Sequence, residues 1–175
     1  DLAVALLADQ LDRRLDDVEG HPRVPVLVAF GQALDLGEIG EVADADTGDR
    51  LAVAIESGEF SGPGLKGTVI TGGGEWPHVR PDNVFCFDAR YHLREDDGTL
   101  IFLQNRGYRH ASPEVMERLW ALRPGDVVDP SEYYFRCTPT FETAPGKHDW
   151  LSRHVFIGVG ERMEEGNRIT YYKVL

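Results

Sequence analysis

Glu75 is a candidate general acid or base in this sequence of 175 residues. It stands directly before Trp76, whose indole ring would exclude water and raise the pKa of the carboxyl group. A carboxyl group with a raised pKa can take up and release a proton near neutral pH. The alternative is an exposed acid in a loop, because the preceding residues 58–74 are rich in glycine.

Asp88, Arg90, Tyr134 and Arg136 complete the set of candidate catalytic residues. Side chains alternate between the two faces of a strand, so Asp88 shares a face with Arg90, and Tyr134 shares one with Arg136. At a barrel mouth or in its lumen, Asp88 would serve as a general acid or base. Arg90, Tyr134 and Arg136 would there stabilise an enolate or a carboxylate. The alternative is a solvated outer face, whose ion pairs each contribute only about 0–1 kcal/mol. The pattern leaves both interpretations open, although only one face of each strand can be core.

Motifs for other kinds of catalysis are missing from the sequence. The glycine-rich residues 58–76 lack the Lys-Ser/Thr pair and the following helix of a phosphate-binding loop, and instead predict turns, bulges and close strand packing. The sequence has no GxSxG nucleophile elbow and no adjacent Cys-His pair, so covalent acyl chemistry is not indicated. The six histidines lack paired metal-ligand spacing, and Cys86 and Cys137 form no CxxC motif. We therefore expect neither a metal nor a cofactor.

Short β-rich segments must position the candidate residues, and turn residues separate these segments. They are 24–34, 50–57, 65–72, 83–95, 98–110, 132–143, 154–163 and 168–175. The Asp-Gly and Gly-Asn pairs at 96–98 and 164–167 predict hairpins, so we expect antiparallel strands.

Two helices accompany the strands. Leucines at spacings of three and four predict an amphipathic helix over residues 1–20. Ser112 as N-cap and Pro113 at the first position predict a short helix over residues 113–123. About eight antiparallel strands favour an up-and-down barrel that can enclose a small ligand, with a sandwich as the alternative. We predict one all-β domain over residues 21–175.

The composition narrows the range of partners. A formal net charge of −12 would repel nucleic acid and anionic membrane surfaces. The sequence contains neither a secretory signal nor an apolar run of membrane-spanning length, so we expect a cytoplasmic protein. Both faces of the segment 154–163 carry apolar residues, which predicts an outer surface covered by the N-terminal helix or by a second subunit. A homodimer or larger homo-oligomer is therefore expected.

Four stretches of the sequence, taken in order, resemble the DUF3237 family, also called UPF0311, over about residues 24–175. They are residues 58–76, 80–107, 132–143 and 149–162. Glu75 stands where the family usually has Asp, and Asn83 stands where a Gly usually follows Asp82.

The resemblance implies a small antiparallel barrel with a central pocket, of the calycin and allene-oxide-cyclase kind. The resemblance also favours a pocket role for part of the polar strand residues described above. The predicted substrate-binding residues are Arg50, Trp76, Tyr91, Asn105, Glu142 and Trp150.

The favoured function is that of a cofactor-free isomerase, cyclase or lyase. It would act on a small aromatic or polyketide-like molecule by acid–base catalysis in the barrel pocket. The alternative is a barrel that carries or senses a small molecule without chemistry, and a purely structural subunit is a third hypothesis.

Overall fold

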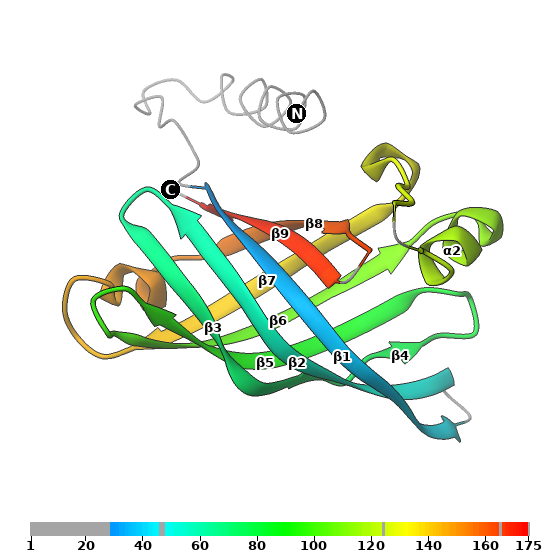
Figure 1. Ribbon diagram of the computed structural model, residues 1–175, viewed down its shortest axis with the longest axis horizontal. Coiled ribbons are helices and arrows are strands. Elements are labelled where there is room, and N and C mark those ends of the chain that lie inside the picture. Colours follow the sequence, from blue (N-terminus) through cyan, green and yellow to red (C-terminus); the bar gives the residue numbers. More distant parts are fainter. Residues whose placement is uncertain (1–28, 46–47, 124, 165, 175) are drawn as a thin grey trace, which may run out of the picture.

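Residues 29–45, 48–123, 125–164 and 166–174 are described by the computed structural model, and most of them form β-strands (Figure 1). The strands are β1 (Ala29–Ala45), β2 (Gly48–Gly62), β3 (Leu65–Glu75), β4 (His78–Val79), β5 (Phe85–Glu95), β6 (Leu100–His110), β7 (Tyr134–Thr143), β8 (Phe156–Arg162) and β9 (Gly166–Lys173). The helix α2 (Pro113–Trp120) and the 3-10 turn η1 (Pro130–Glu132) lie between β6 and β7, and a second 3-10 turn, η2 (Asp149–Arg153), precedes β8.

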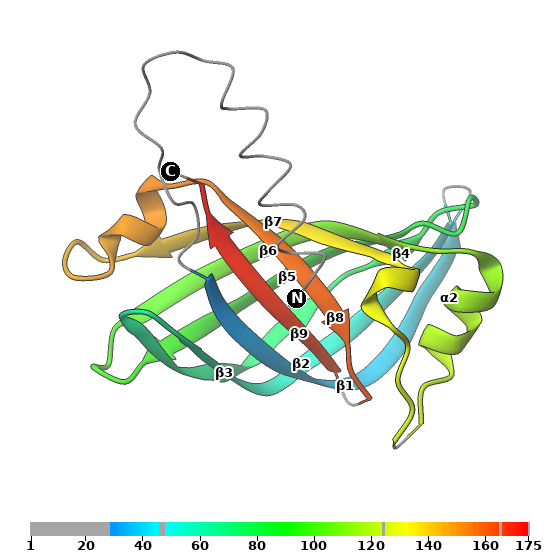
Figure 2. The same ribbon diagram turned by 90° about the horizontal axis from the view of Figure 1, so that it is seen from above.

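The sheet closes on itself into a barrel. Its order is β1-β9-β8-β7-β6-β5-β3-β2, and β2 pairs back with β1, with every pairing antiparallel. The short β4 pairs with β2 and β5, which are also the neighbours of β3. It therefore takes the place of β3 in the sheet beyond a break at Pro77. The curved wall is visible from two directions (Figures 1 and 2). The predicted antiparallel barrel is therefore confirmed, and the sandwich alternative is excluded.

Alternating side chains decide which surface of the wall faces inward. On β5 the aromatic and aliphatic set is buried, with Tyr91 and Leu93 at most 1% exposed. At the alternate positions Arg90, His92 and Arg94 are exposed, whereas Asp88 is half-buried and Cys86 is buried. Burying the apolar set removes the most apolar surface from water, so the polar set is left on the outside.

The glycine run at the end of β3 allows the barrel wall to bend. Gly72 has φ +104°, a conformation that side-chain-bearing residues rarely adopt, and the ladder between β3 and β5 shifts register between Ile70 and Gly74. A Cβ atom on Gly73 would lie 2.4 Å from the Cβ atom of Tyr91. The turns and close packing expected from these glycines are thus observed.

The helix α2 lies at one end of the barrel, and η2 lies at the other (Figure 1). Ser112 accepts a hydrogen bond from the backbone N–H of Val115 at 3.4 Å, which confirms the predicted N-cap. Met116 and Leu119 point into the core. The helix ends at Trp120, three residues earlier than predicted.

Some expectations concern residues at the edges of the described structure. The predicted helix 1–20 lies outside it. The first two strands extend well beyond the predicted segments 24–34 and 50–57.

Val155 and Ile157 are exposed on the outer surface, 68% and 40% respectively, and the oligomer that would cover them stays a prediction. None of the helices in the described ranges is long and apolar enough to cross a membrane.

Candidate functional site

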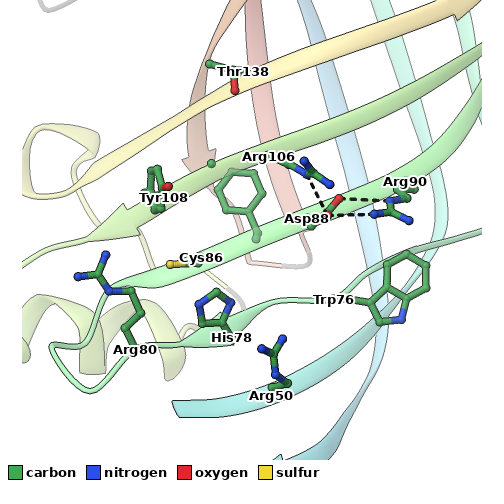
Figure 3. Close-up of a pocket in the computed structure, with 12 residues that line it drawn as sticks. Arg50, Trp76, His78, Arg80, Cys86, Asp88, Arg90, Arg106, Tyr108 and Thr138 are labelled. Carbon is green, nitrogen blue, oxygen red and sulfur yellow. Dashed lines mark hydrogen bonds and ion pairs between the residues drawn. The ribbon is translucent and has the colours of Figure 1, made fainter. Parts of the chain in front are cut away.

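The barrel wall separates two polar groups of residues. We call the inward group the interior cluster, which consists of Glu75, Tyr91, Asn105, Arg109, Tyr133, Arg162 and Tyr171. We call the outward group the outer pocket, a hollow of about 820 Å³ (Figure 3). Its lining consists of Arg50, Trp76, His78, Arg80, Cys86, Phe87, Asp88, Arg90, Arg106, Gly107, Tyr108 and Thr138.

Glu75 is the acidic member of the interior cluster. It is the last residue of β3, where its backbone pairs with Val53 on one side and with Ala89 on the other, and its side chain is 6% exposed. Burial raises the pKa of the carboxyl group to about 7, against the opposing effect of the positive charges on Arg109 and Arg162. Both protonation states of Glu75 are therefore populated at neutral pH.

Arg109 lies in an aromatic enclosure at the α2 end of the barrel. Its guanidinium carbon is 4.4 Å from the ring centre of Phe85 and 5.3 Å from that of Trp120. Burial lowers the pKa of the guanidinium to about 10, and the neighbouring charge of Arg162 acts in the same direction. Aromatic faces stabilise a cation in this setting, so Arg109 stays protonated near neutral pH.

Arg162, at the end of β8, is held by its own hairpin. Its Nη1 donates to the carbonyl oxygen of Gly166 at 2.9 Å, and its backbone N–H donates to the hydroxyl oxygen of Tyr133 at 2.9 Å. Burial lowers the pKa of Arg162, while the charge of Glu75 raises it. Burial also raises the pKa of Tyr133, which keeps the phenol neutral.

A chain of hydrogen bonds crosses the middle of the barrel. Asn105 donates from Nδ2 to the hydroxyl oxygen of Tyr171 at 3.0 Å, and the hydroxyl groups of Tyr171 and Tyr91 are 3.3 Å apart. Burial raises the pKa of Tyr171, and it raises the pKa of the nearby Cys137 thiol to about 12. These groups are therefore neutral hydrogen-bonding partners, and Cys137 is a poor nucleophile.

Three buried polar atoms of the interior cluster have no hydrogen-bond partner within the described part of the chain. They are Asn105 Oδ1, Arg109 Nε and Arg162 Nε. A buried polar atom without a partner is costly, on the order of 1–3 kcal/mol. These atoms are therefore still available for hydrogen bonds, and two of them belong to the arginines whose charges act on Glu75.

The structure divides the predicted site residues between the two sides of the wall. Glu75, Tyr91 and Asn105 lie in the interior cluster. Arg50, Trp76, Asp88 and Arg90 line the outer pocket. The prediction did not separate these sets, because alternation shows that two faces exist without showing which one is enclosed.

The remaining predicted residues also lie away from Glu75. Tyr134 is 44% exposed and stacks on His110, and Arg136 lies on the same outer face. The interpretation that these polar faces line the lumen is therefore wrong, since the aromatic faces of β5 and β7 occupy it. Exposed Glu142 lies outside as well. Trp150 is half-buried at η2, where its ring packs near Phe156.

Sequence reasoning missed Arg109, Tyr133 and Arg162. The usable signal was a polar residue on the apolar side of a strand: Arg109 shares its face with Ile101 and Leu103. Arginine is rarely buried, so this pattern is unusual.

A separate cluster of ionisable residues links the β5–β6 turn to the segment before η2. Ligand atoms of Glu95, Asp97 and His148 lie within 4.8 Å of one another. Lys147 Nζ already lies 3.3 Å from Asp97 and 3.7 Å from Glu95, and His148 Nε2 is 2.9 Å from Asp97. The carboxylates thus have cationic or hydrogen-bonding partners, which is typical of a structural ion-pair network.

The fold and the interior cluster define a class: a small closed antiparallel β-barrel with ionisable groups inside. The chain belongs to the family described as "Protein of unknown function (DUF3237)", whose model matches residues 25–174. A UPF0311 protein of Clostridium acetobutylicum is 39% identical over 131 residues, which cover 75% of this chain and 81% of that protein. The resemblance inferred from the sequence is confirmed.

Crystal structures with the same fold agree with this membership. A conserved protein of unknown function from Rhodopseudomonas palustris has a TM-score of 0.81 at 29% identity and covers 89% of this chain and all of its own. A beta-barrel like protein from Acinetobacter baumannii has a TM-score of 0.73 at 33% identity, covering 89% of this chain and 99% of its own. A structure described as an enzyme from Penicillium herquei, at 20% identity and a TM-score of 0.63, shows the fold alone; it covers 89% of this chain and 99% of its own.

Proposed function

We propose that this protein is a cofactor-independent enzyme that moves a proton on a small organic molecule, with Glu75 as the general acid and base. The observation that carries the proposal is the burial of the Glu75 carboxyl group near the cations Arg109 and Arg162, and this burial raises its pKa to about 7. General acid–base catalysis is most efficient when the pKa of the catalytic group lies near the working pH.

The reaction that these groups suit is enolisation. The Glu75 carboxylate takes a proton from a carbon next to a carbonyl group, and the electron pair of the broken C–H bond moves onto the carbonyl oxygen. Arg109 and Arg162 stabilise the resulting oxyanion in a site of low dielectric constant. Protonated Glu75 then returns the proton to another atom, which gives isomerisation, or supports ring closure or elimination.

This proposal transfers the oxyanion role from Arg90 and Arg136 to the interior arginines. The β-sheet lies between Glu75 and the outer residues, so a molecule that touches Glu75 cannot also touch them. The Penicillium herquei enzyme shares the fold, which makes the barrel compatible with catalysis without indicating the reaction.

The test begins with the natural ligand. The protein is isolated from its native host, and its retained small molecules are identified by mass spectrometry. The identified compound is then incubated with the wild type, with Glu75→Gln and with Glu59→Gln as a control on the exposed surface of β2. We expect turnover by the wild type, a loss of about 10²-fold or more in Glu75→Gln, and no change in Glu59→Gln.

Two results would contradict the proposal. Equal turnover by Glu75→Gln would remove Glu75 from the mechanism. A compound that is bound and returned unchanged by all three proteins would identify a carrier, in which the interior polar groups are only ligand contacts.

A further inference from the structure

The outer pocket lies where side chains from five strands converge on the outside of the barrel. One row runs across the strands from Arg50 through His78, Cys86 and Tyr108 in consecutive register positions. The next row contains Asp88, Arg106 and Thr138. Trp76 adjoins this second row, because its backbone N–H donates to the carbonyl oxygen of Asp88 at 3.0 Å. The volume of about 820 Å³ is within the usual range for small-molecule sites.

The pocket is cationic although the chain has a net charge of −12. Four arginines line it, and Asp88 is the single acidic residue of the lining. Asp88 receives hydrogen bonds from Arg106 Nε at 3.0 Å and from Arg90 Nη2 at 3.2 Å. No hydrogen bond within the described ranges uses the terminal nitrogens of Arg106, so its outer donors are available to a ligand.

Arg50 and His78 add donors that no group in the described part of the chain uses. Neither side chain forms a hydrogen bond or an ion pair with any part of the chain that the structure describes. They are register partners on β2 and β4, and both point toward the pocket (Figure 3). An arginine offers a planar pair of N–H groups that matches a carboxylate.

Aromatic surfaces accompany these charges. Trp76 and Tyr108 are each 53% exposed, which is unusual for such large rings. The Trp76 ring lies over Gly74. A Cβ atom on Gly74 would be 3.0 Å from the indole, so the missing side chain leaves room for the ring against the wall. One face of a flat molecule could stack on either ring.

From these features we infer that the outer pocket binds an aromatic carboxylate, with Arg50 and Arg106 on the carboxylate group and Trp76 on the ring. The site is separate from Glu75, because consecutive residues of β3 and its continuation point to opposite sides of the wall. It therefore does not depend on the proposed reaction, and it gives the protein a second ligand site on its outer surface.

The test uses 2-naphthoate as probe and the neutral 2-naphthamide as its uncharged analogue. Binding is measured by calorimetry at low ionic strength, and the Trp76 indole N–H signal is followed by NMR. We expect naphthoate to bind, to shift the Trp76 signal, and to bind at least tenfold more tightly than naphthamide. Arg50→Gln and Arg106→Gln should each weaken binding about tenfold, and Trp76→Leu about fivefold.

Matched variants make the outcome decisive. Arg94→Gln removes an exposed arginine from the outer face of β5 outside the pocket, and should leave naphthoate affinity unchanged. Glu75→Gln should also bind normally, which separates this inference from the proposed function. Equal losses in Arg94→Gln and Arg50→Gln, a loss in Glu75→Gln, or equal affinity for naphthamide would overturn it. Inorganic phosphate binding as tightly as naphthoate would also overturn it, because the ring would then contribute nothing.

Discussion

Glu75 and Asp88 are two carboxylates near arginines on opposite sides of one wall, and their pKa values move in opposite directions. Burial raises the pKa of Glu75 to about 7, since the arginines near it act only through space. Partial burial would also raise the pKa of Asp88, but hydrogen bonds from Gln104, Arg90 and Arg106 outweigh this effect and lower it. The difference teaches that direct hydrogen bonds and exposure decide the pKa, rather than the presence of arginine nearby.

The same contrast separates chemistry from binding. A carboxyl group that titrates near pH 7 can exchange protons with a ligand, as in the interior cluster. A carboxylate held ionised by three donors instead organises the arginines around it, as in the outer pocket. Each of the following predictions tests one side of the wall against the other.

The largest effect is expected from adding a methyl group to the inner side of β6. In Gly107→Ala the new Cβ atom would lie 2.1 Å from the carbonyl oxygen of Arg136 and 2.5 Å from the Phe87 ring. Because backbone has to move, we expect unfolding free energy to fall by about 3 kcal/mol or more. The neighbouring Arg106→Ala, on the outer side, should cost only about 0–1 kcal/mol. Urea denaturation of both variants measures this, and similar losses would contradict the assignment of inner and outer faces.

Glu75→Gln should change the pH dependence of stability. The folded state binds the Glu75 proton more tightly than the unfolded state, whose pKa is near 4.5, so wild-type stability falls as the pH rises from 4.5 through 7. The expected fall from this group is on the order of 3 kcal/mol. The difference between wild type and Glu75→Gln, measured by urea denaturation from pH 4.5 to 8, isolates it. A difference that does not change with pH would show that Glu75 titrates normally.

Asp88→Asn should give a smaller effect of opposite sign. The pKa of Asp88 is lower in the folded state than in the unfolded state, so the ionised carboxylate stabilises the protein at pH values above the pKa of the unfolded state. This stabilisation is lost as the pH falls through the pKa of the folded state. At 28% side-chain exposure we expect less than about 1 kcal/mol. Denaturation at pH 7 and pH 3 checks this, and an Asp88→Asn variant with unchanged acid sensitivity would contradict it.

Much of the fold could be predicted because it depends on local patterns. The hairpin at 96–98, the cap at Ser112 and the strand at 98–110 follow from turn chemistry, capping and alternation. The lengths of β1 and β2 could not be predicted, since polar and glycine-rich residues continue both strands and only cross-strand pairing holds them extended. Asn83 has φ +61°, a conformation that Asn tolerates better than most residues with a side chain.

The candidate site was only half predictable. The sequence argument singled out Glu75 because Trp76 would desolvate it, and this reason is wrong. The two residues lie on opposite sides of the wall, and Trp76, 53% exposed, does not enclose the carboxylate. The desolvation comes instead from the barrel interior, which brings together Glu75, Arg109 and Arg162 from three distant segments.

The sequence by itself determined the antiparallel strands, the points where they turn and the two alternating faces of each, because these depend on residues close together in the chain. Only the tertiary structure decided which face is enclosed and which arginines lie near Glu75. Closing the sheet fixes both at once, since burial of the larger apolar surface and the register between strands are properties of the whole barrel.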